Sequence, residues 1–259
     1  MSELHVLVFA PHPDDAEICC GGFLSKMAHL GYQTGIVDLT RGELSSQGDL
    51  ETRVKETAAA TQVLGLAVRE NLELPDGAIG CEAPAENGDW EGTQLTKVVS
   101  SLRRLKPEIV VIPYWDDRHP DHIGTSELLS RAIFYSGLRK FMPALGAPHV
   151  PHQTLHYAVR YEHILSFVCD ITEVYETKKK AIQCYRSQVL RDTSREGPAT
   201  LLSNPLVPQW LEARDKYYGA MIGREYGEAY LSRSILEIED PVRQFRLSKG
   251  ADAFIFPQK

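Results

Sequence analysis

The first half of the chain consists of short apolar runs separated by amphipathic stretches. Three apolar runs predict buried strands, because they are short and rich in β-branched and aromatic residues: 5–9, 34–39 and 109–112. The spacing of apolar positions predicts helices over 23–30, 53–64 and 95–105. Strands that alternate with helices indicate an α/β fold, with a mainly parallel central sheet and helices on both of its faces.

The second half of the chain has a less regular pattern. It predicts a strand over 164–171 and helices over 177–190 and 209–221, and the proline-containing stretch 193–208 is expected to be a loop near the functional site. Lys178, Lys179 and Lys180 are consecutive and predict a solvated helix face. No repeat, low-complexity tract or linker divides the chain, so residues 1–259 are expected to form a single domain.

The amino-acid composition indicates which binding partners and which cellular compartment to expect. The 259 residues carry a formal net charge of −7, which argues against general binding to nucleic acid or to membrane surfaces. No apolar run reaches transmembrane length, and the N-terminus lacks the basic start and cleavage site of a signal peptide. The five cysteines are odd in number and irregularly spaced, which indicates reduced thiols. We therefore expect a cytoplasmic protein.

Two polar segments stand out, and each directly follows a predicted strand. They are 10–17 (APHPDDAE) and 117–122 (DRHPDH). In parallel sheets, ligands bind beyond the carboxyl ends of the strands, where both segments fall. A hydrolytic zinc site needs three protein ligands and one open position, and imidazole and carboxylate suit zinc or a similar divalent ion. The first segment offers a histidine and a carboxylate, and the second offers another histidine.

These segments contain more candidate groups than a metal requires. Amide hydrolysis would use the surplus: a carboxylate to take a proton from water, and an imidazole to meet the oxyanion or the leaving amine. A further carboxylate would orient an imidazole. Alternatively, aspartate-rich turns after strands only cap the following helix. Cys19 and Cys20 adjoin the first segment, but buried small residues are the favoured interpretation over metal ligands.

The two segments also carry a family resemblance. Residues 12–17 form His-Pro-Asp-Asp-x-Glu, and residues 119–122 form His-Pro-Asp-His. The chain thereby resembles the LmbE-like (PIG-L) zinc-dependent deacetylases. Further similarity runs through 38–48, 71–77, 114–122, 184–188 and 217–230, whereas 231–259 match nothing in the family. The resemblance implies a Rossmann-like three-layer fold with the metal at the carboxyl ends of the strands.

The resemblance also implies roles for individual residues. It places Zn2+, or another divalent ion such as Fe2+, on His12, Asp15 and His122. It makes Asp14 the general base, and His119, steadied by Asp121, the group that serves the tetrahedral intermediate. Some members add a tyrosine from a loop, but no tyrosine occurs between residues 190 and 210, so Tyr217, Tyr218 and Tyr226 remain as candidates. Relatives assemble into oligomers up to hexamers, so a homo-oligomer is expected.

Two arginines are candidate substrate-binding residues. Arg53 matches a substrate-contacting arginine of the family, although a surface ion pair with Glu51 or Glu56 is the alternative. Arg118 adjoins the second motif, and Arg41 fits a simple loop charge better. A guanidinium binds a carboxylate in a bidentate fashion, so Arg53 or Arg118 would suit an acidic group on the substrate.

The implied activity is hydrolysis of the acetamide of an N-acetylglucosaminyl conjugate, a small N-acetylated amino sugar. Within the family, the chain is most similar to the branch that acts on N-acetylglucosaminyl malate in bacillithiol biosynthesis. Alternatives are a mycothiol-type inositol conjugate, a chitooligosaccharide, or a non-catalytic metal- or sugar-binding protein on the same scaffold. Nucleotide binding is disfavoured, because no G-x-G-x-x-G follows the first strand.

Overall fold

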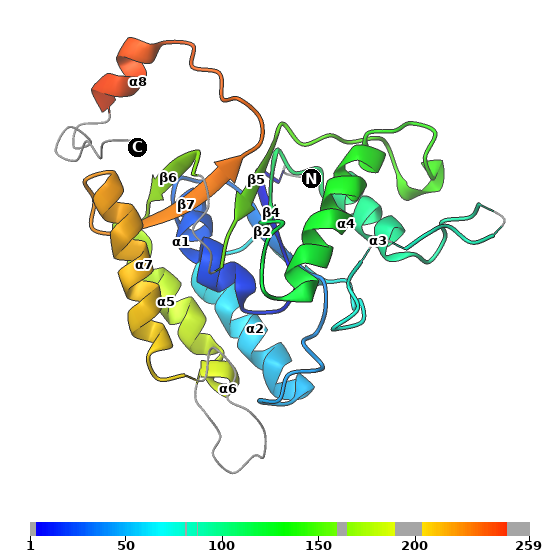
Figure 1. Ribbon diagram of the computed structural model, residues 1–259, viewed down its shortest axis with the longest axis horizontal. Coiled ribbons are helices and arrows are strands. Elements are labelled where there is room, and N and C mark those ends of the chain that lie inside the picture. Colours follow the sequence, from blue (N-terminus) through cyan, green and yellow to red (C-terminus); the bar gives the residue numbers. More distant parts are fainter. Residues whose placement is uncertain (1–3, 81, 87, 160–164, 190–203, 248–259) are drawn as a thin grey trace.

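A single mixed sheet forms the centre of the molecule (Figure 1). The computed structural model describes residues 4–80, 82–86, 88–159, 165–189 and 204–247. Its strands are β1 (Val6–Ala10), β2 (Thr34–Asp38), β3 (Val68–Asn71), β4 (Ile109–Pro113), β5 (Gln153–Tyr157), β6 (Phe167–Asp170) and β7 (Gly227–Ser232). They lie in the order β3-β2-β1-β4-β5-β7-β6, and only β7 runs antiparallel to its neighbours. The predicted α/β class is confirmed.

Helices cover both faces of this sheet (Figure 1). One face carries α1 (Asp15–His29), α2 (Leu50–Leu64), α5 (Tyr175–Cys184), α6 (Arg186–Val189) and α7 (Val207–Met221); the other carries α3 (Gln94–Leu105) and α4 (Pro120–Ser136). The short α8 (Pro241–Leu247) stands apart from the layers (Figure 1). No helix in the described ranges is long and apolar enough to cross a membrane.

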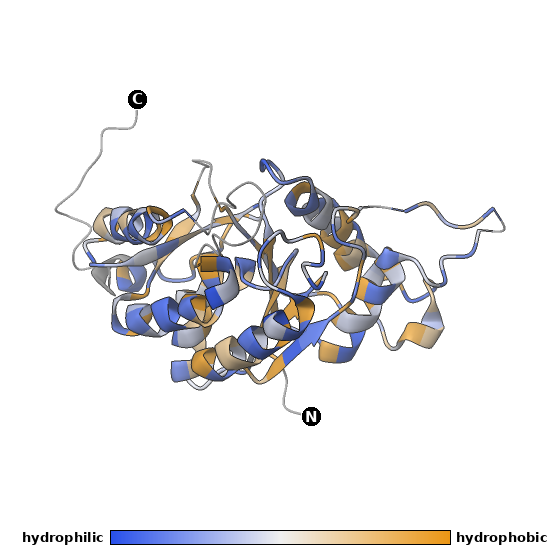
Figure 2. Cartoon of the chain, turned by 90° about the horizontal axis from the view of Figure 1, so that it is seen from below, coloured by the Kyte–Doolittle hydropathy of each residue, from blue (hydrophilic) through white to orange (hydrophobic). Residues whose placement is uncertain are grey.

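Strand β1 explains why two helical layers are needed. Val6 and Val8 face the core shared with α1, whereas Leu7 and Phe9 face the core shared with α3 and α4. A strand that is buried on both faces consists of consecutive apolar residues, and this pattern predicted β1 from the sequence. Figure 2 shows the same arrangement, with hydrophobic strands inside and hydrophilic outer surfaces on the helices.

The predicted strands over 5–9, 34–39, 109–112 and 164–171 are confirmed, with shifted ends, as β1, β2, β4 and β6. The predicted helices over 53–64, 95–105 and 209–221 are confirmed as α2, α3 and α7. The pattern did not predict α4, β3, β5 or β7, because their residues mix polar and apolar types without a clear period. Most of the predicted loop 193–208 lies outside the described residues.

Helix α1 begins at Asp15, eight residues before the predicted start at residue 23. The prediction was wrong because the polar motif and the Gly21–Gly22 pair look like a loop. Glycine costs a helix about 1 kcal/mol relative to alanine, but packing requires it here. A Cβ on Gly22 would lie 2.7 Å from the Cδ1 of Ile171.

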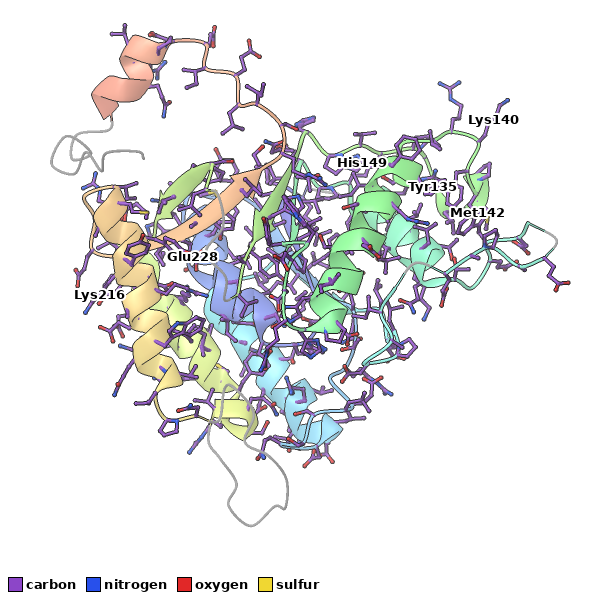
Figure 3. All side chains as sticks on the ribbon, viewed as in Figure 1. Tyr135, Lys140, Met142, His149, Lys216 and Glu228 are labelled. Carbon is purple, nitrogen blue, oxygen red and sulfur yellow. The ribbon has the colours of Figure 1, made fainter. Side chains whose placement is uncertain are left out.

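The predicted solvated lysine face is wrong at Lys178. Its side chain is 1% exposed and lies on the inner side of α5, between Asp215 of α7 (2.6 Å) and Glu228 of β7 (2.8 Å). Glu228 also accepts the backbone N–H groups of Gly22 and Phe23 in α1. In Figure 3, Glu228 lies among the elements that it joins, whereas Lys216 on α7 points outward. The buried charges therefore connect α1, α5, α7 and β7.

Helix α4, which follows the second motif, is fixed at its far end by a buried arginine. The Arg103 guanidinium, on α3, donates to five backbone carbonyls; the acceptors are Tyr135, Ser136, Leu138, Met142 and Gly146. Tyr135 at the end of α4 and Met142 in the following loop lie close together in Figure 3. One side chain therefore holds the end of α4 and its loop against α3.

We expect Arg103→Met to lower the free energy of unfolding by at least about 2 kcal/mol, because hydrogen bonds from a charged donor contribute about 1.5–3 kcal/mol each and several are lost. Urea denaturation measures this change. The matched control is Arg104→Met on the same helix, which removes a half-exposed ion pair with Glu70 and should cost less than about 1 kcal/mol. Equal losses for the two variants would contradict the assignment.

Candidate metal centre

The two sequence motifs meet because their strands are neighbours. β1 and β4 pair in parallel, with Val8 opposite Val111, so both strands end at the same edge of the sheet. His12 and Asp15 lie in the turn from β1 into α1, and His122 lies in the first turn of α4. The predicted position at the carboxyl edge of the sheet follows directly from this pairing.

Three of these side chains point their donor atoms at one spot. His12 Nδ1 lies 3.1 Å from Asp15 Oδ2, and His122 Nε2 lies 3.3 Å from the same oxygen. Two ligand atoms bound tetrahedrally to one zinc ion at 2.0–2.2 Å are separated by about 3.3 Å. The residues therefore fit a metal of this size, and this group is one of two potential metal-binding clusters within the described residues.

Carboxylates orient both imidazole ligands from behind. The second nitrogen of His122, Nδ1, lies 3.2 Å from Asp117 Oδ2. The second nitrogen of His12, Nε2, lies 3.1 Å from Asp76 Oδ1 and 3.3 Å from Asp121 Oδ2. Metal-binding histidines commonly donate their other N–H to such groups, which fixes the tautomer and the ring orientation.

The sequence reasoning assigned no role to Asp76 or Asp117. Asp117 falls inside the second polar segment, two residues before His119, so its position was a usable signal. Asp76 lies in a Pro-Asp-Gly turn after β3, a strand that was not predicted, and its approach to His12 could not be read from the sequence.

Asp14 lies beside the ligands without joining their cluster. Its backbone has φ 119°, a left-handed conformation that costs a non-glycine residue about 1–3 kcal/mol and is often found at functional sites. Arg53 of α2 holds this turn by donating from Nη1 to Asp14 Oδ2 (3.1 Å) and to the carbonyl of Pro13. Burial raises the pKa of Asp14 to about 7, against the opposing charge of Arg53.

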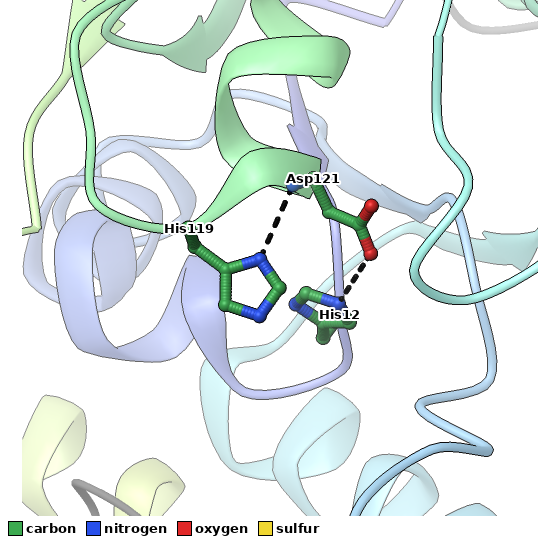
Figure 4. Close-up of side chains that lie close together, drawn as sticks. All are labelled: His12, His119 and Asp121. Carbon is green, nitrogen blue, oxygen red and sulfur yellow. Dashed lines mark hydrogen bonds and ion pairs between the residues drawn. The ribbon is translucent and has the colours of Figure 1, made fainter.

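His119 occupies the end of α4 that faces the ligands, 4.9 Å from the ring of His12 and 5.0 Å from that of His122. Its Nδ1 accepts the backbone N–H of Asp121, so a neutral ring carries its proton on Nε2 (Figure 4). Burial and the neighbouring histidines lower the pKa of His119, which favours that neutral ring. An N–H donor is therefore available to a substrate oxygen.

Asp121 does lie next to His119, but the contact runs through its backbone N–H. Its carboxylate turns instead toward His12 and toward the loop after β3, where it accepts the N–H groups of Gly77 (2.8 Å) and Ile79 (3.3 Å). Figure 4 shows two of these interactions: the backbone N–H of Asp121 with His119, and its carboxylate with His12. Asp121 thus contacts His119 through its backbone, while its carboxylate holds His12 and the loop after β3.

Glu17, the last residue of the first motif, is buried in the protein interior. Its fully buried carboxylate pairs with Arg69 of β3 (2.5 Å) and accepts the hydroxyl of Tyr185 (3.0 Å). Arg69 in turn pairs with Asp38 at the end of β2 (2.8 Å). Tyr185 separates α5 from α6, which is why the single helix predicted over 177–190 is interrupted there.

The remaining candidates are placed as follows. Arg53 is buried against Asp14, so the alternative of a surface ion pair is wrong. Arg118 is exposed. Cys19 and Cys20 are buried in the core on α1, as the favoured interpretation predicted. The four cysteines in the described ranges are free thiols, and Cys81 lies outside those ranges.

None of the candidate tyrosines has a contact with His119 within the described part of the chain. Tyr226 stacks on Tyr175, with ring centroids 3.6 Å apart, and Tyr217 is half exposed on α7. The accessory tyrosine of some relatives therefore has no counterpart among the interactions of His119 that the structure describes.

Comparisons with known proteins identify a family model and several relatives. Residues 7–133 match the family model PIG-L, described as GlcNAc-PI de-N-acetylase. The chain is 28% identical over 234 residues to the diacetylchitobiose deacetylase of Thermococcus kodakarensis, covering 86% of this chain and 80% of that protein. It is 25% identical over 202 residues to a probable N-acetyl-alpha-D-glucosaminyl L-malate deacetylase of Bacillus anthracis, covering 67% and 86% respectively.

A solved structure agrees along nearly the whole chain. The crystal structure of a conserved protein from Thermus thermophilus has 35% sequence identity and a TM-score of 0.78, covering 91% of this chain and 98% of that one. The chain therefore belongs to the PIG-L (LmbE-like) deacetylase family. It is an N-deacetylase, and several of the relatives that it matches are named as deacetylases of N-acetylglucosamine conjugates.

We expect His12→Ala to lose tightly bound metal, because the variant removes one of three converging ligand atoms. Elemental analysis of purified protein, before and after dialysis against a chelator, measures the occupancy. The control is His29→Ala, at the exposed end of the same α1 helix, which should keep the wild-type occupancy. Full occupancy in folded His12→Ala would overturn the assignment of the ligands.

Proposed function

We propose that this protein is a zinc-dependent hydrolase of the acetamide in an N-acetylglucosaminyl conjugate. One observation carries the proposal: the convergence of His12, Asp15 and His122 beside two groups that are not part of this ligand set, Asp14 and His119. A binding protein would need the ligands but not a further carboxylate and imidazole beside them. The family match supplies the substrate class.

When bound, a divalent ion supplies a Lewis acid that polarises the acetyl carbonyl and lowers the pKa of water. Asp14 then takes the proton from the attacking water, and its strained turn, held by Arg53, aims the carboxylate. His119 donates from Nε2 to the developing oxyanion. The proton held by Asp14 passes to the leaving amine as the carbon–nitrogen bond breaks, which releases acetate and the free amino sugar.

The Asp14→Asn variant should keep its metal and lose about a hundredfold to ten-thousandfold in deacetylation rate, because it removes the general base. Acetate release from N-acetylglucosamine conjugates, together with metal analysis, measures both properties. Near-normal turnover by folded, metal-loaded Asp14→Asn would make this residue a turn former only.

The pH profile of the wild-type rate provides a second test of Asp14. The base must be ionised, so the rate should fall as the pH drops through the pKa of Asp14, which is about 7 without metal. A bound cation favours the carboxylate and moves this acid limb to lower pH. The limb should be absent from the residual rate of Asp14→Asn, and its persistence there would assign it to another group.

For the particular substrate, we propose N-acetylglucosaminyl malate, as an intermediate of bacillithiol biosynthesis. The similarity to the Bacillus anthracis relative, which is named for that substrate, supports this choice. Arg118 is suited to the malate carboxylates, because it is exposed beside the second motif and has no hydrogen-bond or ion-pair partner within the described residues. Arg53 is suited to a different task, since Asp14 already engages it.

A comparison of substrates should distinguish the roles of Arg53 and Arg118. Arg118→Ala should reduce kcat/KM for the malate conjugate about tenfold, since it removes a charge-assisted pair, and leave plain N-acetylglucosamine nearly unchanged. Arg53→Lys should reduce both rates equally, because it disturbs the turn at Asp14. Wild-type enzyme that prefers chitooligosaccharide or the inositol conjugate would favour those alternatives instead.

A further inference from the structure

Asp76 makes a contact that neither the motifs nor the reaction explains. It lies in the turn after β3, 64 positions from His12 in the sequence, with a side chain only 7% exposed. Its Oδ1 lies 3.1 Å from His12 Nε2, and its Oδ2 accepts the backbone N–H of Leu44 at 2.8 Å. One carboxylate therefore joins a metal-ligand histidine to the loop between β2 and α2.

Asp76 is one of two carboxylates that face Nε2 of His12, and it is the nearer of the two. A neutral imidazole that offers Nδ1 to a metal has a single proton, on Nε2. Asp121 Oδ2 is farther from that nitrogen, at 3.3 Å, and already accepts the N–H of Gly77 at 2.8 Å. Asp76 Oδ1 lies within hydrogen-bond distance of the proton on Nε2 of His12, so Asp76 shares the task of holding this ring with Asp121.

The other contacts of Asp76 hold the neighbouring loop. Its backbone N–H donates to Glu43 Oε1 (3.0 Å), and Glu43 Oε2 accepts the N–H of Arg41 (3.2 Å). Next to Arg41, a Cβ on Gly42 would lie 3.5 Å from the guanidinium of Arg53, so the loop also borders the arginine that holds Asp14. Asp76 therefore contacts both the metal-ligand residue His12 and the 41–44 segment.

We propose that Asp76 is a positioning residue for the metal centre: it fixes the tautomer of His12, aims Nδ1 at the ion, and holds the 41–44 segment in the same arrangement. This inference rests on the metal centre of the proposed function. Asp76 is not in the ligand cluster, yet its removal should weaken metal binding, because partners of this kind commonly change metal affinity 10–100-fold.

The test is the zinc affinity of the full-length protein, measured by competition with a chromophoric chelator. Asp76→Ala should bind zinc about 10–100-fold more weakly than wild type. Asp76→Leu, which fills more of the space but also lacks an acceptor, should do the same and serves if the alanine variant does not fold. The Co2+-substituted variants should show altered visible bands, because His12 is no longer held in one orientation.

Two control variants separate positioning from general loosening. Asp170→Ala removes an aspartate that also accepts a loop N–H, from Thr172, but at the end of β6. Glu43→Ala removes the acceptor of the backbone N–H groups of Arg41 and Asp76 but keeps the Asp76 carboxylate that contacts His12. Both should keep the zinc affinity and the Co2+ spectrum of wild type, and urea unfolding of the metal-free proteins checks that all variants fold.

The outcomes distinguish this inference from the proposed function. Wild-type affinity and spectrum in folded Asp76→Ala or Asp76→Leu would overturn the inference and leave the metal centre intact. Equal weakening in Glu43→Ala would also overturn it, because the loop and not the imidazole contact would then be responsible. Wild-type protein that binds no divalent ion would refute the metal centre itself.

Discussion

The parallel pairing of β1 with β4 is the constraint on which the site depends. It brings two turns, about a hundred residues apart in sequence, to one edge of the sheet, and it requires both strands to be buried on both faces. The polar groups at that edge then have few ways to be solvated. They are instead paired with one another: Asp117 with His122, Asp14 with Arg53, and Glu17 with Arg69. These contacts within the protein hold the side chains of the centre in place.

The sequence predicted the layers and the residues of the two motifs, because buried strands and metal-ligand clusters leave local patterns. It could not predict what reaches the site from elsewhere. Asp76 follows a strand whose residues, VREN, are polar and only half buried. Lys178 looked solvated because its partners, Asp215 and Glu228, are far away in the chain. Long-range contacts between charged groups have no periodicity, so only the folded arrangement reveals them.

The prediction of where α1 begins was wrong for a related reason. Its first turn contains the metal-ligand Asp15 and the buried Glu17, and its middle contains two glycines, so propensity favours a loop. Tertiary contacts override that preference: Ile171 packs against Gly22, and Glu228 accepts two of the helix's N–H groups. Such conflicts between local preference and the observed structure are expected at functional sites, where chemistry constrains the residue choice.

The anchoring of α1 by Glu228 bears on how this enzyme could be divided or shortened. All six residues assigned to metal binding and catalysis, and both candidate arginines, fall within residues 7–133, the part that matches the family model. The supports of α1 fall beyond it, on α5, α7 and β7. The stretch with the chemistry is therefore not a transplantable module. A split enzyme would work only if the second fragment, ending after β7, reassembled with the first, and recombination between relatives must keep α1 and β7 from the same parent.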